Sequence, residues 1–110
     1  MAEGFKEIAQ IDKVIHEPAR LSIMAILSGC ESTDFTYLAR ATELTHGNLS
    51  GHLARLERAG YLAVHKGYNG RIPQTTYSLT PKGTQAFTNY WKGLKEFVNQ
   101  IESGIEVKKE

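Results

Sequence analysis

The residues best suited to chemistry lie between positions 45 and 60, where small and hydrogen-bonding side chains recur at helical spacing. At about 100° per residue, Leu49, Leu53 and Leu56 share one narrow face, which predicts a core-facing side. The opposite face carries two glycines, and each costs a solvated helix about 1 kcal/mol relative to alanine. Such a face suits a helix whose backbone approaches another surface closely, and a DNA major groove offers hydrogen-bonding edges to asparagine, serine and arginine. The candidate groove residues are Thr45, His46, Gly47, Asn48, Ser50, Gly51 and Arg55.

Several of these residues also have simpler explanations. The alternative for the two glycines is a first helical turn that frays, and Thr45 is a good N-cap whether or not it contacts DNA. His52 lies at the flank of the leucine face, where a buried, hydrogen-bonded role and a phosphate contact are both consistent with its position. Arg58 points outward near the helix end, where interaction with the helix dipole is a sufficient role.

The distribution of charge favours the same segment. The chain of 110 residues has a formal net charge of only +1. Residues 1–44 hold four cations against seven acids, whereas residues 45–77 hold four cations against one acid, a local net charge of +3. A local basic excess suits a polyanionic partner, although on its own it is weak evidence.

A second candidate element follows the glycine-bearing helix. Residues 61–66 and 75–79 alternate apolar and polar side chains, which predicts a β-hairpin. The glycines and the proline between them predict a loop too long for a two-residue turn. An arginine near a hairpin tip suits the negative potential of a narrow minor groove, whereas Asn69 is also explained by turn chemistry. The candidate contacts here are Lys66, Tyr68, Asn69 and Arg71.

The elements that position these residues are mostly helical. Helical periodicity and capping residues predict helices over residues 4–16, 19–28, 34–41, 46–59 and 81–103, with Pro18 in the first turn of the second helix. Ser32 or Thr33 is expected to cap the third helix, and Gly60 to end the fourth. The fold class is therefore mostly α with a small β-hairpin, in one domain spanning residues 1–110.

Three stretches carry a family resemblance. Residues 44–64, with the pattern Leu-Thr-x-x-x-Leu-Ser-x-His-Leu-x-x-Leu-Glu-x-x-Gly-Tyr-Leu, resemble the recognition helix and first wing strand of MarR- and ArsR-type regulators. Residues 76–83 resemble the Tyr-x-Leu-Thr-x-x-Gly close of these families, and residues 16–24 are similar to their Pro-x-Arg-Leu-x-Ile opening. The resemblance implies a winged helix-turn-helix core over residues 14–80, flanked by dimerisation helices over 4–16 and 81–103. It also implies double-stranded DNA as partner, with the recognition helix in the major groove and Arg55 on phosphate or base.

The last helix carries an apolar seam. Phe87, Trp91, Leu94, Val98, Ile101 and Ile105 are spaced 4, 3, 4, 3 and 4 residues apart, which is typical of a heptad repeat, and Tyr90 and Phe97 widen it. Burial against a second copy is the expectation, with Phe5, Ile8 and Ile15 of the first helix on the partner face. The alternative is that this helix folds back on its own domain. A homodimer would place two recognition helices about 34–36 Å apart.

Other functions fit the sequence less well. The sequence shows no Ser-His-Asp spacing, and its four histidines are scattered, so neither an enzyme nor a metal or other cofactor is expected. Cys30 is the only cysteine, which excludes an intramolecular disulfide, and a buried or half-buried position is expected for it. A cytoplasmic repressor without a membrane span is the expectation. A winged helix module that binds protein, and a metal- or small-molecule-responsive sensor, remain as alternatives.

Overall fold

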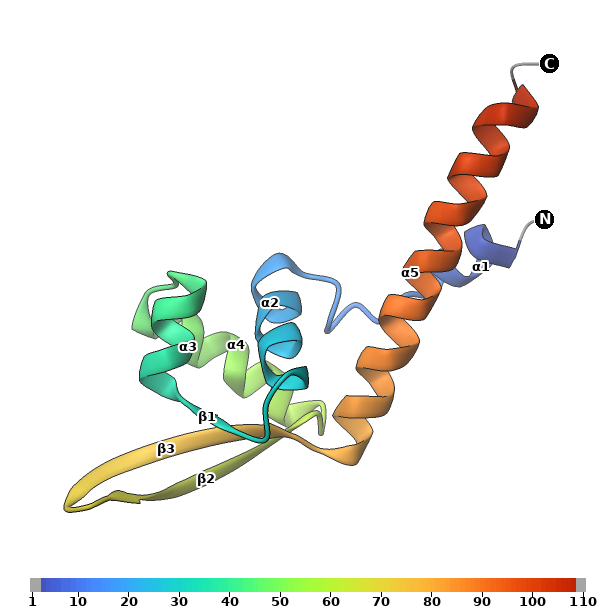
Figure 1. Ribbon diagram of the computed structural model, residues 1–110. Helices are drawn as coiled ribbons and strands as arrows, with labels where there is room; N and C mark the ends of the chain where they lie inside the picture. Colours follow the sequence, from blue (N-terminus) through green and yellow to red (C-terminus); the bar gives the residue numbers. More distant parts are fainter. Residues whose placement is uncertain (1–2, 109–110) are drawn as a thin grey trace.

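The computed structural model describes the backbone of residues 3–108 and, within that range, the side chains of residues 5, 6 and 8–104; Ile105 of the predicted seam lies outside the described side chains. Five helices and three strands follow one another, which confirms the mostly helical fold class (Figure 1). In chain order they are α1 (Glu3–Ala9), α2 (Pro18–Ser28), β1 (Thr33–Asp34), α3 (Phe35–Thr42), α4 (His46–Arg58), β2 (Leu62–Asn69), β3 (Ile72–Leu79) and α5 (Pro81–Lys108).

The core lies where α2, α3 and α4 pack together over one end of the sheet (Figure 1). The central helix, α2, begins with Pro18 in its first turn, as expected, and buries Ile23, Met24 and Leu27. The leucines of α4 join this cluster, together with side chains from the flanking segments. The remaining buried members are Ile15, Leu38, Leu62 and Tyr90.

The sheet is antiparallel, with strand order β1-β3-β2. The short strand β1 was not anticipated; it pairs Thr33 with Tyr77, and therefore Asp34 rather than Ser32 or Thr33 caps α3. The predicted long hairpin loop is wrong. Pairing of β2 with β3 extends to Asn69 and Ile72, which leaves a two-residue turn. Gly70 has φ +68° at the first turn position, a conformation that glycine adopts without strain in tight hairpins.

The first helix is shorter than expected because Asp12 interrupts it. One carboxylate oxygen of Asp12 accepts hydrogen bonds from the backbone N–H groups of Val14 (2.9 Å) and Ile15 (3.2 Å), which closes a local turn that competes with helix. The prediction of a helix through residue 16 is therefore wrong, since α1 ends at Ala9. Ile15 is completely buried in the chain's own core, so it does not lie on the surface expected to meet a partner.

The second carboxylate oxygen of Asp12 accepts a hydrogen bond from the hydroxyl of Tyr61. Burial, and then this hydrogen bond and the charge of Asp12, raise the pKa of Tyr61 to about 12. A raised folded-state pKa stabilises the fold below the unfolded value of about 10, and this contribution is lost as the pH rises from about 10 toward 12.

The last helix, α5, extends beyond the expected residue 103 and projects away from the body as an arm (Figure 1). Helix α1 lies along it, where the rings of Phe5 and Phe97 meet edge to face at 5.8 Å. The radius of gyration is 17.0 Å, whereas a compact domain of this length has about 13 Å. The chain is thus elongated, with extents of 67 × 26 × 21 Å.

The base of α5 is fixed against the segment that follows α4. The N–H of Thr80 donates to the carbonyl of Tyr61 at 3.0 Å, and its hydroxyl donates to the carbonyl of Gly60 at 2.6 Å. A Cβ atom at Gly83 would lie 2.2 Å from the Tyr61 carbonyl oxygen. Only glycine therefore permits this close approach of two backbone segments.

Cys30, expected to be buried or half-buried, is exposed. Helix α2 ends at Ser28 with Gly29 as its C-cap, so Cys30 has already left the helix whose inner face enters the core. Its thiol donates to the carbonyl of Ile26 at 3.5 Å.

We expect Gly83→Ala to lower the free energy of unfolding by about 2–3 kcal/mol, because the added methyl group must displace backbone. Gly93→Ala, in the same helix, is the matched control. A Cβ there meets nothing within 4 Å, so this change should raise stability by about 0.5–1 kcal/mol. Urea denaturation of both variants measures the difference, and equal stabilities would contradict the close approach.

Candidate nucleic-acid interface

Helix α4 has one fully buried side and one open side. Leu49 and Leu56 are 0% exposed and Leu53 is 3% exposed. On the opposite side, a Cβ atom built at Gly47 or Gly51 meets nothing within 4 Å. The glycine side therefore faces open space, and another molecule can approach the helix there.

The start of α4 is held by two contacts. The hydroxyl of Thr45 accepts a hydrogen bond from the N–H of Asn48 at 3.1 Å, which confirms Thr45 as the N-cap. The ring of His46 packs edge to face against Phe35 of α3, with ring centroids 5.2 Å apart. The side chains of Asn48 and Ser50 remain exposed on the first two turns.

A shallow, open hollow lies beside the glycines and is rich in arginine. Two helices supply its cations: Arg55 and Arg58 come from α4, and Arg20 comes from α2. The complete lining is Arg20, Gly47, Asn48, Gly51, His52, Arg55 and Arg58. Sequence reasoning placed Arg55 at the site but omitted Arg20 from it, because Arg20 is 35 positions away in the chain. Its signal was the Pro-x-Arg-Leu opening of α2.

Arg20 connects α4 to the segment before α2. Its Nε donates to the carbonyl of Val14 at 2.5 Å, and one terminal nitrogen lies 3.2 Å from Nδ1 of His52. Because an arginine in a protein always donates, Nδ1 of His52 is the acceptor in this contact. His52 is half-buried and hydrogen-bonded, as one of the two expectations had it.

Glu17 lies close to both Arg20 and His52. Its carboxylate caps α2 by accepting the N–H of Arg20 at 2.8 Å, and it lies 3.8 Å from Nδ1 of His52. The backbone hydrogen bond from Arg20 is the main cause that lowers the pKa of Glu17, and it outweighs burial, which acts in the opposite direction.

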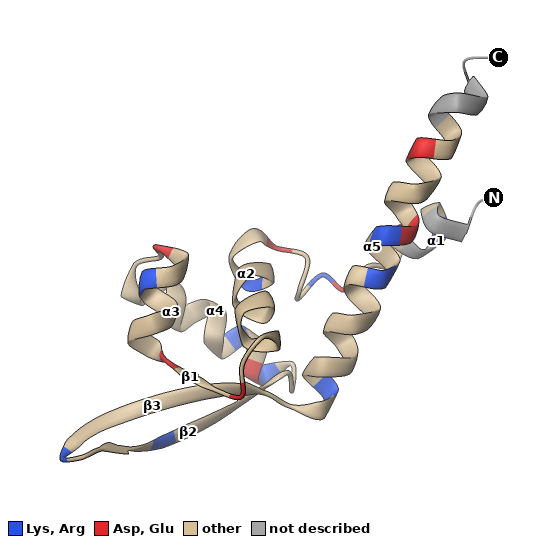
Figure 2. Ribbon diagram, in the orientation of Figure 1, with Lys and Arg blue, Asp and Glu red and all other residues tan. Residues whose placement is uncertain are grey.

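The hairpin forms the second part of the site. Lys66 lies in the strand β2, as expected, whereas Tyr68 and Asn69 lie in β2 rather than in a loop, and Arg71 occupies the two-residue turn. All four are exposed. The hairpin, residues 62–79, contains lysine and arginine but no aspartate or glutamate, and Figure 2 shows its cations along β2 and at the tip.

A groove separates α4 from this hairpin. Ser50 and Ala54 line it on the helix side, and Lys66 and Gln74 line it on the strand side. Two acids also reach it. The carboxylate of Asp34 already has two partners. It caps α3 by accepting a hydrogen bond from the N–H of Tyr37, and it accepts another from Nε2 of Gln74 at 2.9 Å. The second acid is Glu57. Burial, and then the charge of Glu57, raise the pKa of Tyr77, which also lines the groove.

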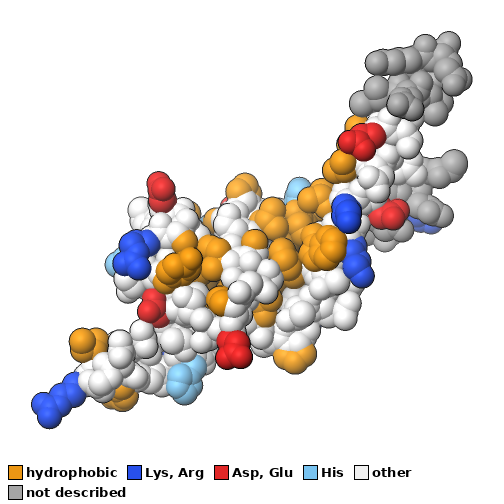
Figure 3. Space-filling model, in the orientation of Figure 1, with side chains coloured by type: hydrophobic (Ala, Val, Ile, Leu, Met, Phe, Trp, Pro, Cys, Tyr) orange, Lys and Arg blue, Asp and Glu red, His pale blue; other side chains and the backbone are white. Residues whose placement is uncertain are grey.

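The predicted apolar seam divides into two parts. Phe87 and Leu94 pack against the core of the body, as the alternative of folding back on the domain had it. Trp91, Val98 and Ile101 are 41%, 44% and 38% exposed. Apolar side chains gather on one face from the middle of the body onto α5 (Figure 3). Of the α1 residues, Ile8 is half-buried and Phe5 is 46% exposed.

Two further features are absent from the described part of the chain. No group of three or more histidine, cysteine, aspartate or glutamate side chains there is arranged to hold a metal ion. Likewise, no described helix has the length and apolar content that a bilayer span requires.

Comparison with known proteins gives consistent matches. The winged helix DNA-binding domain family matches residues 19–98. An uncharacterized protein of Methanocaldococcus jannaschii is 36% identical over 91 residues, which cover 82% of this chain and 98% of that protein. A solved transcriptional regulator homologue from Pyrococcus horikoshii superposes with a TM-score of 0.81 at 29% identity, over 90% of this chain and 97% of the other. A putative MarR-family regulator from Enterococcus faecalis shares the fold, with a TM-score of 0.67 at 22% identity over 94% and 90% of the two chains.

Proposed function

Because this chain belongs to the winged helix DNA-binding domain family and is a DNA-binding transcriptional regulator, we propose how it acts. It binds a specific duplex sequence as a homodimer, with α4 in the major groove and the β2–β3 hairpin, its wing, at the minor groove. Bound in this way, it represses transcription by occupying the promoter.

The open glycine side of α4 carries this proposal. A helix of about 10–12 Å diameter with its side chains fits a major groove about 12 Å wide, and a backbone that approaches the bases closely requires small groove-facing residues. Gly47 and Gly51 meet that requirement, and Asn48, Ser50 and Arg55 beside them supply donors and acceptors for base edges and phosphates. The proposed contacts on α4 are Thr45, His46, Gly47, Asn48, Ser50, Gly51, His52 and Arg55, with Arg58 and Arg20 at the edge.

The wing extends the same basic surface. Lys66 and Arg71 are exposed cations on a hairpin without acids, which suits the phosphates on either side of a minor groove. Tyr68 and Asn69 complete the proposed wing contacts. A module that bound only protein would not need this charge, and the experiments below separate the two functions.

The homodimer is supported by the shape of the chain. Trp91, Val98 and Ile101 of the arm are exposed, and so is Phe5 of α1. These side chains lie outside the body, so its core does not cover them. A second arm packed alongside would bury these side chains. We propose that Phe5, Ile8, Trp91, Val98 and Ile101 form the dimer contact, and that Phe87 and Leu94 support it from the body.

Repression follows from this arrangement. A regulator consisting of a DNA-binding body and a pairing arm can exclude polymerase by occupying a site that overlaps a promoter. Selection of bound sequences from random duplex DNA would supply the operator for the measurements that follow.

We expect Gly51→Leu to weaken binding to the selected duplex at least about tenfold, because a bulky side chain would hold the helix out of the groove. The same change should stabilise the folded protein by about 0.5–1 kcal/mol, since glycine is a poor helix former. Fluorescence anisotropy measures the first effect and thermal unfolding the second. Ala25→Leu, at an exposed position of α2, is the control; unchanged binding by Gly51→Leu would contradict the groove assignment.

Asn48→Ala and Lys66→Ala should act differently. Loss of a base contact at Asn48 should cost about 1–3 kcal/mol on the selected sequence and little on unrelated DNA. Loss of a phosphate contact at Lys66 should weaken binding to all sequences alike and reduce the salt slope by about one. Gel shifts at several salt concentrations check both, and two unaffected variants would show that this surface does not bind DNA.

Val98→Glu should convert the dimer to a monomer, because burying an unpaired carboxylate in the contact is unfavourable by about 3 kcal/mol or more. Asn99→Glu adds the same charge at a neighbouring exposed position outside the seam, and it should leave the dimer intact. Sedimentation at micromolar concentration measures both. A monomeric wild-type protein would refute the homodimer.

A further inference from the structure

The tip of the wing carries the two most exposed large hydrophobic residues of the described chain. Tyr68 is 75% exposed and Ile72 is 69% exposed, whereas the other exposed large hydrophobic residues do not exceed 47%. Apolar side chains presented so fully to water are typical of a contact surface. The tip also lies at the opposite end of the molecule from the arm (Figure 1), so the proposed dimer contact does not account for it.

The two side chains lie on opposite faces of the hairpin. Residues paired directly across an antiparallel ladder share a face. Tyr68 pairs with Pro73, and Ile72 pairs with Asn69, one position further along. Apolar surface on both faces of a narrow strand pair suits insertion between two walls, whereas docking on a flat protein or lipid surface would use one face.

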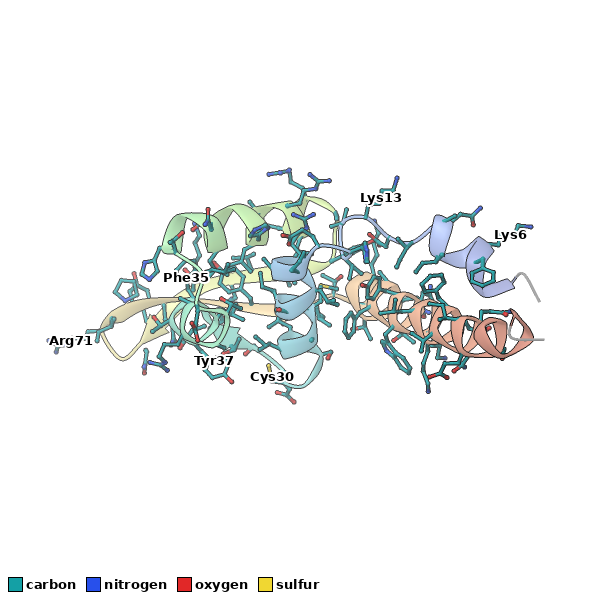
Figure 4. All side chains as sticks on the ribbon, turned by 90° about the horizontal axis from the view of Figure 1, so that it is seen from above. Lys6, Lys13, Cys30, Phe35, Tyr37 and Arg71 are labelled. Atoms are coloured by element: carbon teal, nitrogen blue, oxygen red, sulfur yellow. The ribbon has the colours of Figure 1, made fainter. Side chains whose placement is uncertain are left out.

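The local charge identifies the walls as phosphate-bearing. Arg71 stands at the turn beside Ile72, and Lys66 shares a face with Tyr68. The whole hairpin lacks acids. The side-chain view places Arg71 at the extreme end of the molecule, beyond the helices (Figure 4). Apolar residues between flanking cations reproduce the chemistry of proteins that wedge aliphatic side chains into a minor groove and deform it.

Resting on the proposed function, we propose that Ile72 and Tyr68 form an apolar wedge that enters the minor groove, contacts the deoxyribose walls and bends the duplex. Arg71 and Lys66 hold the wedge in place through phosphates. The two-residue turn keeps the wedge narrow, and β1, which reaches only to residues 76 and 77 of β3, leaves the tip uncovered.

The experiment measures affinity and DNA bending together, with the full chain and a selected duplex labelled at its two ends for energy transfer. We expect the bound wild type to raise transfer, because bending brings the ends together. Ile72→Ser should weaken binding about fivefold to tenfold, as for loss of a partly buried aliphatic side chain, and should reduce the bend while leaving the salt slope unchanged. Arg71→Ala should instead reduce the salt slope by about one.

Tyr68→Ser tests the second face, and Tyr37→Ser is the control. Tyr37 is 47% exposed and lies with Cys30 on the side of the body away from α4 (Figure 4), so its loss should change neither readout. Circular dichroism confirms folding of each variant. If the wild type binds and both wing variants bind and bend DNA as it does, the wedge is refuted and the proposed function stands. If the wild type binds no duplex, the proposed function fails and the wedge with it.

Discussion

The burial of three leucines on one side of α4 sets the orientation of everything else that the chain presents to solvent. Leu49, Leu53 and Leu56 lie in the same cluster as the apolar residues of α2, so the helix cannot rotate about its axis without exposing them. Each such side chain contributes about 1.5–3 kcal/mol when fully buried. The glycine side is consequently fixed outward. Rigidity of this kind is what a surface that reads a sequence requires, because hydrogen bonds to base edges tolerate little error in position.

The segment between α1 and α2 ties the separate parts of the molecule to one another. Asp12 bonds Tyr61 at the end of α4, His16 bonds the hydroxyl of Tyr90 on α5 at 3.0 Å, and Arg20 joins the segment to His52 on α4. The arm and α4 are therefore both held by hydrogen bonds to one stretch of eight irregular residues, 10–17. Polar contacts that are all satisfied rigidify a structure and specify one arrangement.

Much of this architecture could be predicted from local signals, and most of the failures have a common cause. Thr45, Gly60 and Pro18 act within one helical turn of where they stand, so their roles follow from residue type alone. The end of α1 is harder to predict, because the Asp12 turn that replaces the helix is also held by Tyr61, 49 positions away. The strand β1 has two residues and exists only through its pairing with β3. Arg20 was likewise not expected at the site, because only the folding of the chain brings it close to α4. The wing turn was misjudged for a different reason: Gly67 and Pro73 are ordinarily turn residues, but here both lie within paired strands.

The contact between Gly83 and the Tyr61 carbonyl gives α5 the mechanics of a lever. The helix has 28 residues and is therefore about 42 Å long, and its contacts with the body, from the first turn to Leu94, lie in its N-terminal half. A tilt of about 5° there, which backbone angles absorb readily, displaces the far end by about 4 Å over this length. In the proposed homodimer, the separation of the two bodies is thus geometrically sensitive to small changes at the junction of α4, β2 and α5.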